Sequence, residues 1–354
     1  MRRRIATLTV ATLLLVYVPA PAQGIVYDVF GAYLDSLREQ AGIPGLAAVI
    51  VDKDRIVWEG AYGRQDIGRA LPTRTDTPFN ADGLTQVFTA AMVLRCTEER
   101  RLSLDDRTGD FRGTTSERDA TIRQLLTHTS GAPDNLTFAL RPERLEPLRP
   151  IVRACAVDSY RETFANLLTR LSMFDSVPGP NIINVVAPEE GVPHRDEVVR
   201  YTTTLERRAL PYAVDNRGRA SGGEYPQSAA VLTPSSGLVT TVRDLAKFDL
   251  ALRDGILVFP ETLAEAWSAP ADSVGRPLPH GLGWFVQTYH GEKVVWQFGA
   301  GENASSSLMI TLPARGLTLI MMANSDRLVR SFRLGDGDVS LSPFARLFLS
   351  LFVR

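Results

Sequence analysis

Residues 45–66 read GLAAVIVDKDRIVWEGAYGRQD, and this stretch decides the fold that we expect. Two runs rich in apolar and β-branched residues flank the polar tetrapeptide DKDR, a pattern typical of a β-hairpin. Residues 280–299 repeat the pattern around HGEK, and residues 304–325 repeat it around PARG. Because β-rich stretches lie near both ends of the chain, the sequence predicts one antiparallel sheet to which both ends contribute strands.

Between these stretches the apolar residues recur at helical spacing. The pattern predicts helices within residues 85–100, 121–131, 159–174 and 240–255, and a short amphipathic helix in the tail, 342–354. Gly131 and Gly255 are placed as helix stops, and Thr241 with Asp244 resembles a capping box. We therefore expect an α/β (α+β) domain over residues 23–354. Its sheet lobe would comprise residues 25–75 and 275–354, and its inserted, mainly helical lobe residues 76–274.

The N-terminus has the composition of a signal peptide. Three arginines at residues 2–4 precede the apolar run IATLTVATLLLVYV, and Ala20-Pro21-Ala22 fits the small-x-small cleavage rule. We expect residues 1–22 to be removed near Ala22/Gln23, which makes the mature protein secreted or periplasmic. The apolar run is short for a membrane anchor. Cys96 and Cys155 can pair in an oxidising compartment or remain small buried hydrophobes, and the sequence leaves both alternatives open.

Composition excludes several classes of partner. The 354 residues carry 39 basic and 40 acidic side chains, so the net charge of −1 creates no overall field that favours nucleic acid or an anionic membrane. His194, His280 and His290 lack the spacing of metal ligands, and surface or turn positions are expected for them. No cofactor is implied, and no stable membrane anchor is expected after cleavage of the signal peptide.

Four sequence segments occur in an order that is typical of one protein family. They are RLSLDD followed by TIRQLLTHTSGAP (101–106 and 121–133), TPSSGLVTTVRDLAKF (233–248), GLGWF (281–285) and LPARGLTLIMMANSD (312–326). This order resembles the serine β-lactamase and penicillin-binding-protein family, in its class C-like and esterase-like branch, over roughly residues 30–326. The resemblance implies a beta-lactamase/transpeptidase-like fold. It also gives His128 and Ser130 a structural rather than a catalytic role.

The motifs that carry the chemistry of that family are missing. The family places Ser-x-x-Lys at the start of a buried helix, where the amine can take the proton of the hydroxyl nucleophile. These positions fall on Gly83 and Gln86. The tyrosine of Tyr-x-Asn falls on Leu140, and Lys-Thr-Gly or His-x-Gly falls on the segment from Gln297 to Gly299. None of the three lysines in the chain follows a serine at that spacing.

The sequence therefore predicts a catalytically inactive relative, a pseudoenzyme with a retained ligand cleft. The candidate cleft residues are Gly83, Gln86, Gln297 and Gly299, and the expected ligand is a peptide, a cell-wall fragment or an acyl small molecule. Two alternatives stay open. One is an active esterase or amidase of the same fold with a different nucleophile. The other is a structural or partner-binding exported protein whose cleft has closed, which Leu140 favours slightly.

Overall fold

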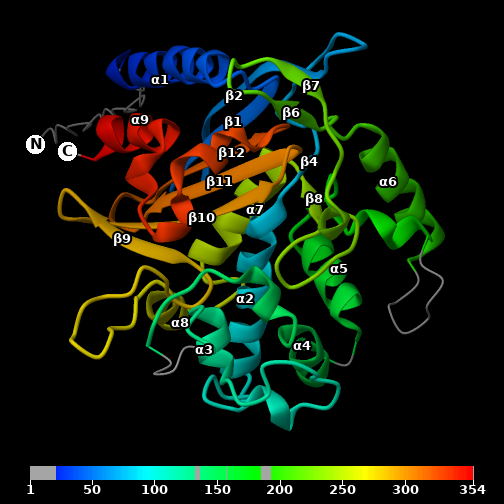
Figure 1. The fold of residues 1–354 in the computed structure, drawn as a ribbon, viewed down its shortest axis with the longest axis vertical. Helices are drawn as coiled ribbons and strands as arrows, with labels where there is room; N and C mark the ends of the chain where they lie inside the picture. The colour runs from blue at the N-terminus through cyan, green and yellow to red at the C-terminus, as the bar shows by residue number, and fades with distance from the viewer. Residues whose placement is uncertain (1–20, 132–135, 157, 185–192, 354) are drawn as a thin grey trace, which may run out of the picture.

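The computed structural model describes residues 21–131, 136–156, 158–184 and 193–353. Its centre is a seven-stranded antiparallel sheet with the strand order β3-β2-β1-β12-β11-β10-β9 (Figure 1). The strands are β1 (Gly45–Asp52), β2 (Arg55–Asp66), β3 (Leu71–Pro72), β9 (Phe285–Tyr289), β10 (Glu292–Gly301), β11 (Ser305–Leu312) and β12 (Leu317–Ala323). Pairing of β1 with β12 joins the two ends of the chain. The three hairpins and the two-ended sheet that the sequence predicts are confirmed.

Both faces of the sheet are buried at its central strands, β1, β12 and β11. Successive side chains of a strand point to opposite faces, so Ala47, Val49 and Val51 of β1 join one apolar core while Leu46, Ala48 and Ile50 join another. Helices α2 (Thr85–Glu98) and α7 (Val242–Arg253) contribute to the first core. Helices α1 (Pro21–Gln40) and α9 (Pro343–Phe352) cover the second face (Figure 1). Burial on both sides explains the uninterrupted apolar run of β1.

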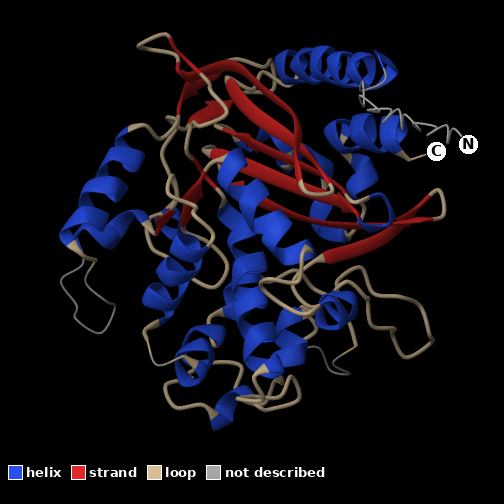
Figure 2. Cartoon of the chain, turned by 180° about the vertical axis from the view of Figure 1, so that it is seen from behind, coloured by secondary structure: helices blue, strands red, loops and turns tan. Residues whose placement is uncertain are grey.

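The segment between the two halves of the sheet surrounds α2 and is mainly helical (Figure 2). Its other helices are α3 (Ile122–Leu126), α4 (Leu148–Cys155), α5 (Tyr160–Arg170), α6 (Arg195–Glu206) and α8 (Pro260–Ala266). It also holds two small sheets. One joins β4 (Phe79–Asn80), β8 (Leu238–Thr240) and β5 (Val177–Pro178), and the other joins β6 (Tyr212–Val214) to β7 (Ala220–Gly222).

Two local expectations differ from the structure. Helix α3 ends at Leu126 rather than at Gly131, because His128 already adopts the left-handed conformation with φ of 54°, which stops a right-handed helix. The capping box predicted for α7 is only half formed. The Thr241 hydroxyl accepts the Asp244 N–H at 3.1 Å, but the Asp244 carboxylate accepts hydrogen bonds from other groups, including the Ser176 hydroxyl at 2.8 Å.

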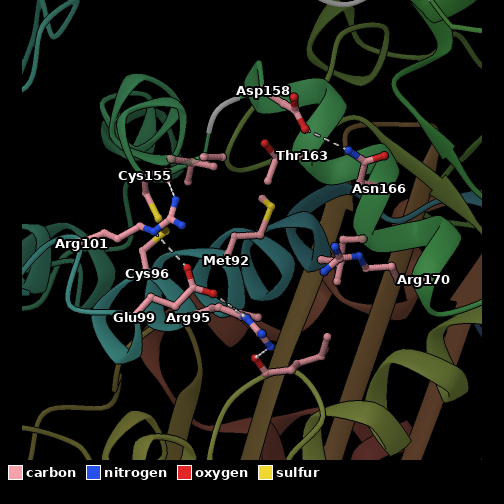
Figure 3. A pocket seen from close by; sticks show the side chains of 15 residues that line it. Met92, Arg95, Cys96, Glu99, Arg101, Cys155, Asp158, Thr163, Asn166 and Arg170 are labelled. Atoms are coloured by element: carbon pink, nitrogen blue, oxygen red, sulfur yellow. Dashed lines mark hydrogen bonds and ion pairs between the residues drawn. A yellow bond between two sulfur atoms is a disulfide. The ribbon is translucent and has the colours of Figure 1, made fainter.

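Cys96 and Cys155 form a disulfide, which settles the pairing that the sequence left open. The bond joins the end of α2 to the end of α4, and it lies in the wall of a cavity of about 250 Å³ (Figure 3). In that view, Arg95, Glu99 and Arg101 lie near the disulfide, and both arginines pair with the Glu99 carboxylate.

The predicted signal peptide falls almost entirely outside the described residues. Only residues 21 and 22 of the predicted peptide are described, and they belong to the first turn of α1. Within the described ranges, no helix is both long and apolar enough to cross a membrane.

Candidate functional site

Gly83 lies in the 3₁₀ turn Asp82–Leu84 that leads into α2, and the backbone of β10 packs directly against this turn. A Cβ atom at Gly83 would lie 2.4 Å from the carbonyl oxygen of Phe298. A Cβ atom at Gly299 would lie 2.2 Å from the carbonyl oxygen of Ala81. Both distances are too short for any carbon–oxygen contact, so the two glycines permit the backbones to touch. The structure leaves no room for a serine at Gly83 without a shift of turn or strand.

Gln86, in the first turn of α2, is bound to His128. Its Oε1 atom lies 3.1 Å from Nε2 of His128, and the backbone N–H of Arg141 donates to Nδ1 of the same ring at 3.4 Å. An amide oxygen can only accept, so Nε2 carries the proton and Nδ1 is the acceptor. The amide that replaces the family's lysine therefore holds one histidine in one tautomer.

Gln297, on β10, makes the matching contacts from the sheet. Its Nε2 donates to the carbonyl oxygen of Gly283 at 3.2 Å and lies 3.4 Å from Nε2 of His280, while its Oε1 accepts the N–H of Phe298 at 2.9 Å. Nδ1 of His280 donates to the carbonyl oxygen of Gly281 at 2.8 Å. His280 thus carries its proton on Nδ1 and accepts on Nε2.

The two imidazoles meet between these glutamines, with ring centroids 4.8 Å apart and planes nearly perpendicular. Phe138 contacts both rings: it stacks on His280 with centroids 5.9 Å apart and meets His128 edge-on at 6.3 Å. Burial lowers the pKa of His128 to about 4. Burial, together with the neighbouring His128, lowers the pKa of His280 well below its ordinary value. Both rings are therefore neutral at pH 7. We call Gln86, His128, His280 and Gln297 the Gln–His cluster.

The structure brings three of the four motif positions together. The backbone around the fourth, Leu140, also lies beside the site, since the N–H groups of Ala139 and Arg141 donate to His128, but the Leu140 side chain packs elsewhere. Gly83, Gln86 and Gln297 meet between α2 and β10. Leu140 instead packs, half-buried, against the core under α9, near Gly335. His280, which the sequence placed at the surface or in a turn, is fully buried, and this expectation was wrong. Its signal in the sequence was weak, because the residue lies far from α2 along the chain and only packing brings it to His128.

A second buried polar group, Asp82, precedes Gly83 in the same turn. Asp82 has a left-handed backbone with φ of 47°, and its carboxylate accepts a hydrogen bond from the Ser305 hydroxyl at 2.7 Å. Burial raises the pKa of Asp82 to about 7, although the bonds from Ser305 and from the Gly301 backbone act in the other direction. Ser307 donates to the carbonyl oxygen of Ala81 at 2.6 Å. Serines of β11 therefore hold the turn in place.

The described part of the chain contains no candidate metal site. No three histidine, cysteine or acidic side chains there come close enough together to hold an ion.

Comparison with known proteins identifies the scaffold. A model of the family described as Beta-lactamase matches residues 30–170 and 186–339, which is more than half of the chain. The chain belongs to the beta-lactamase family. Penicillin-binding protein 4 of Amycolatopsis lactamdurans is 36% identical over 359 residues, covering 90% of this chain and 87% of that protein. Protein flp of Staphylococcus aureus (strain MW2) is 23% identical over 317 residues, covering 81% of this chain. The alignment spans only 60% of the length of that relative.

Solved structures agree with the family on the fold. The octameric penicillin-binding protein homologue from Pyrococcus abyssi superposes with a TM-score of 0.68 at 20% identity, covering 91% of this chain and 77% of that one. The class C beta lactamase from Rhodobacter sphaeroides gives 0.63 at 16% identity, covering 84% and 94%. This member of the beta-lactamase family thus keeps the common scaffold, while Gly83, Gln86 and Gln297 occupy the positions where the resemblance implies reactive groups.

Proposed function

We propose that this protein is a catalytically inactive, exported member of the beta-lactamase family whose reaction site has become a closed, packed junction. The contact between Gly83 and the carbonyl oxygen of Phe298 carries the proposal, because no nucleophilic side chain fits there. Gln86 and Gln297 support it as well. A neutral amide cannot act as a general base, and both amides are engaged by buried neutral imidazoles.

The geometry favours a closed junction over the retained cleft that the sequence suggested. Gln86 is 4% exposed and Gln297 1% exposed. A ligand would have to separate the Asp82–Leu84 turn from β10 and break the Gln–His cluster to reach these side chains. Leaving the buried polar atoms of the cluster unpaired would cost about 1–3 kcal/mol for each hydrogen bond lost. A peptide, a cell-wall fragment or an acyl ligand would therefore bind elsewhere on the molecule.

One observation favours the alternative of an active hydrolase with a different nucleophile. Ser305 donates its hydroxyl proton toward Asp82, a carboxylate whose pKa burial raises to about 7, and a base of that pKa is suited to proton transfer at neutral pH. The pair is also inaccessible, since Ser305 is 1% exposed and Asp82 5% exposed. An inactive protein with a closed junction is therefore better supported than an active hydrolase that uses Ser305.

Export is supported by the disulfide and by the N-terminal sequence. Disulfides persist in oxidising compartments, so the Cys96–Cys155 bond fits a chain that leaves the cytoplasm. Cleavage near Ala22/Gln23 would remove residues 1–22, of which only Pro21 and Ala22 belong to α1. Sequencing the N-terminus of the protein recovered from the periplasm or medium of a secreting host tests this directly. An intact Met1 on the exported protein would contradict cleavage.

The decisive experiment measures acylation and turnover on the purified chain. Wild-type protein and a Ser305→Ala variant are incubated with a fluorophosphonate, a penicillin and a p-nitrophenyl ester, and intact mass and product release are followed. We expect no covalent adduct and no turnover above heat-denatured protein. An adduct or burst that Ser305→Ala abolishes would establish the alternative, and one at another serine would refute inactivity without involving Ser305.

A Gly83→Ser/Gln86→Lys variant sharpens the test, because it restores the family's residue types on the same helix. We expect it to remain inactive and to fold less stably, since the serine Cβ meets the Phe298 carbonyl and the lysine places a cation beside buried neutral rings. Recovery of ester hydrolysis by this variant would show that the junction opens readily and that the site is not closed.

A further inference from the structure

A cavity of about 700 Å³ lies where α4 meets the start of α5, separate from the Gln–His cluster. Arg149, Arg153 and their neighbours on α4 form one wall, the first residues of α5 form another, and a loop before α3 closes the rim. The lining residues are Arg112, Gly113, Arg149, Pro150, Arg153, Ala154, Ser159, Tyr160 and Arg161. Four of these are arginines, and none carries a carboxylate.

Two of the arginines are available to a ligand. Arg112 and Arg153 are exposed, and within the described residues neither side chain takes part in a hydrogen bond or an ion pair. Arg149 is oriented by its neighbours, since its Nε lies 2.9 Å from the Glu146 carboxylate and its Nη2 donates to the carbonyl oxygen of Leu232 at 2.7 Å. Like charges gathered around one concave surface create a positive potential that concentrates anions.

Buried side chains at the start of α5 form the floor of the cavity. The Tyr160 side chain is buried, its hydroxyl lies 2.7 Å from the Thr89 hydroxyl of α2, and the Arg149 guanidinium lies over its ring. Arg161, also buried, donates to the amide oxygen of Asn181 at 3.1 Å. Helix α5, 11 residues long, begins at this floor. Its first turn is already capped, because Ser159 and Glu162 form a capping box in which the Glu162 carboxylate accepts the Ser159 N–H at 2.9 Å. The positive potential of the cavity therefore comes from the arginines.

We propose that this cavity binds a small anion that carries at least two negative charges on phosphate or carboxylate oxygens. Arg112 and Arg153 would contact the charged oxygens from the rim, because the planar guanidinium fork matches the geometry of both groups. Arg149, whose Nε and Nη2 are engaged by Glu146 and Leu232, would contribute its charge from the wall. The volume exceeds that of a single inorganic phosphate. An organic phosphate or a polycarboxylate would fill it better.

Isothermal titration calorimetry at low and at physiological ionic strength tests the proposal with pyrophosphate and citrate as separate probes and glucose as a neutral control. We expect saturable 1:1 binding of at least one anion and none of glucose. An Arg112→Gln/Arg153→Gln variant should weaken the affinity at least tenfold. The anion that binds more tightly identifies the phosphate or the carboxylate class. The ligand should also raise the melting temperature of wild type, since it binds only the folded state.

A matched control separates the cavity from the general effect of charge. Arg55→Gln/Arg346→Gln removes the same two charges from exposed positions outside the cavity, and we expect its affinity to change less than twofold. Equal weakening in both double variants would mean that the anions respond to net charge alone. That result, or the absence of saturable binding of both anions, would overturn the proposal. Melting curves of both variants without ligand verify that each is folded.

Discussion

At the scale of single residues, the close approach of Gly83 to the Phe298 carbonyl can be tested through its effect on the free energy of unfolding. We expect Gly83→Ala to lower the free energy of unfolding by about 1–3 kcal/mol or more, because the added methyl meets a backbone carbonyl and not a flexible side chain. Urea unfolding followed by circular dichroism measures the change. Gly222→Ala is the matched control, since a Cβ there meets nothing within 4 Å, and it should shift the value by less than about 0.5 kcal/mol. Equal effects of the two substitutions would contradict the closed junction.

Asp82 should make stability depend on pH in an unusual direction. Its folded pKa of about 7 lies above its ordinary value of 3.8, so its stabilising contribution is complete below pH 4 and is lost as the pH rises to about 7. His128, whose folded pKa is lowered, has the opposite effect and destabilises the protein as the pH falls from about 6.5 to about 4. His280, whose pKa is also lowered, acts in the same direction as His128. These effects overlap, so wild type alone cannot separate them.

The difference between Asp82→Asn and wild type isolates the carboxyl group. Asparagine tolerates the left-handed backbone and stays neutral. Relative to wild type, we expect the variant to gain stability progressively from pH 4 to pH 7, by about 4 kcal/mol at most. Urea unfolding at a series of pH values measures this difference. Asp54→Asn, which removes an exposed carboxylate, is the control for the loss of one acidic group. A difference between Asp82→Asn and wild type that does not change with pH would contradict the raised pKa of Asp82.

At the scale of elements, the disulfide fastens α2 to α4. It joins residues separated by 59 positions, and closing a loop of this length in the unfolded chain stabilises the fold by about 3–4 kcal/mol. We expect Cys96→Ala/Cys155→Ala to lose about that much stability in urea unfolding. Dithiothreitol should destabilise wild type similarly and leave the double variant unchanged. Insensitivity of wild type to the reductant, with free thiols detected by alkylation, would show that the bond does not form.

At the scale of the whole molecule, the two ends of the chain share one core. Phe348 of α9 is fully buried and packs against Phe30 of α1, with ring centroids 6.5 Å apart. We expect Phe348→Ala to cost about 3–5 kcal/mol and to shift the entire unfolding transition. Far-ultraviolet circular dichroism and tryptophan fluorescence should then give coincident curves. Leu341→Ala, at a position 46% exposed, should change little. Separate transitions would mean that α9 docks as an independent element.

The sequence by itself determined the parts of this protein that local patterns encode. Alternating and apolar runs around DKDR, HGEK and PARG predicted the hairpins. The four segments in their characteristic order predicted the family that the comparisons confirm. The absence of a Ser-x-x-Lys motif also follows from the sequence alone. The inactivity that this absence suggests stays a prediction.

Only the tertiary structure decided how the site is filled. Closure at Gly83 depends on the Phe298 carbonyl, and the pairing of His128 with His280 depends on the loop before β9, so neither is encoded near α2. The disulfide and the arginine cavity likewise arise where α4 meets its neighbours. The physical reason is that periodicity fixes which face of an element is buried, whereas packing between segments distant in the chain fixes which atoms meet there.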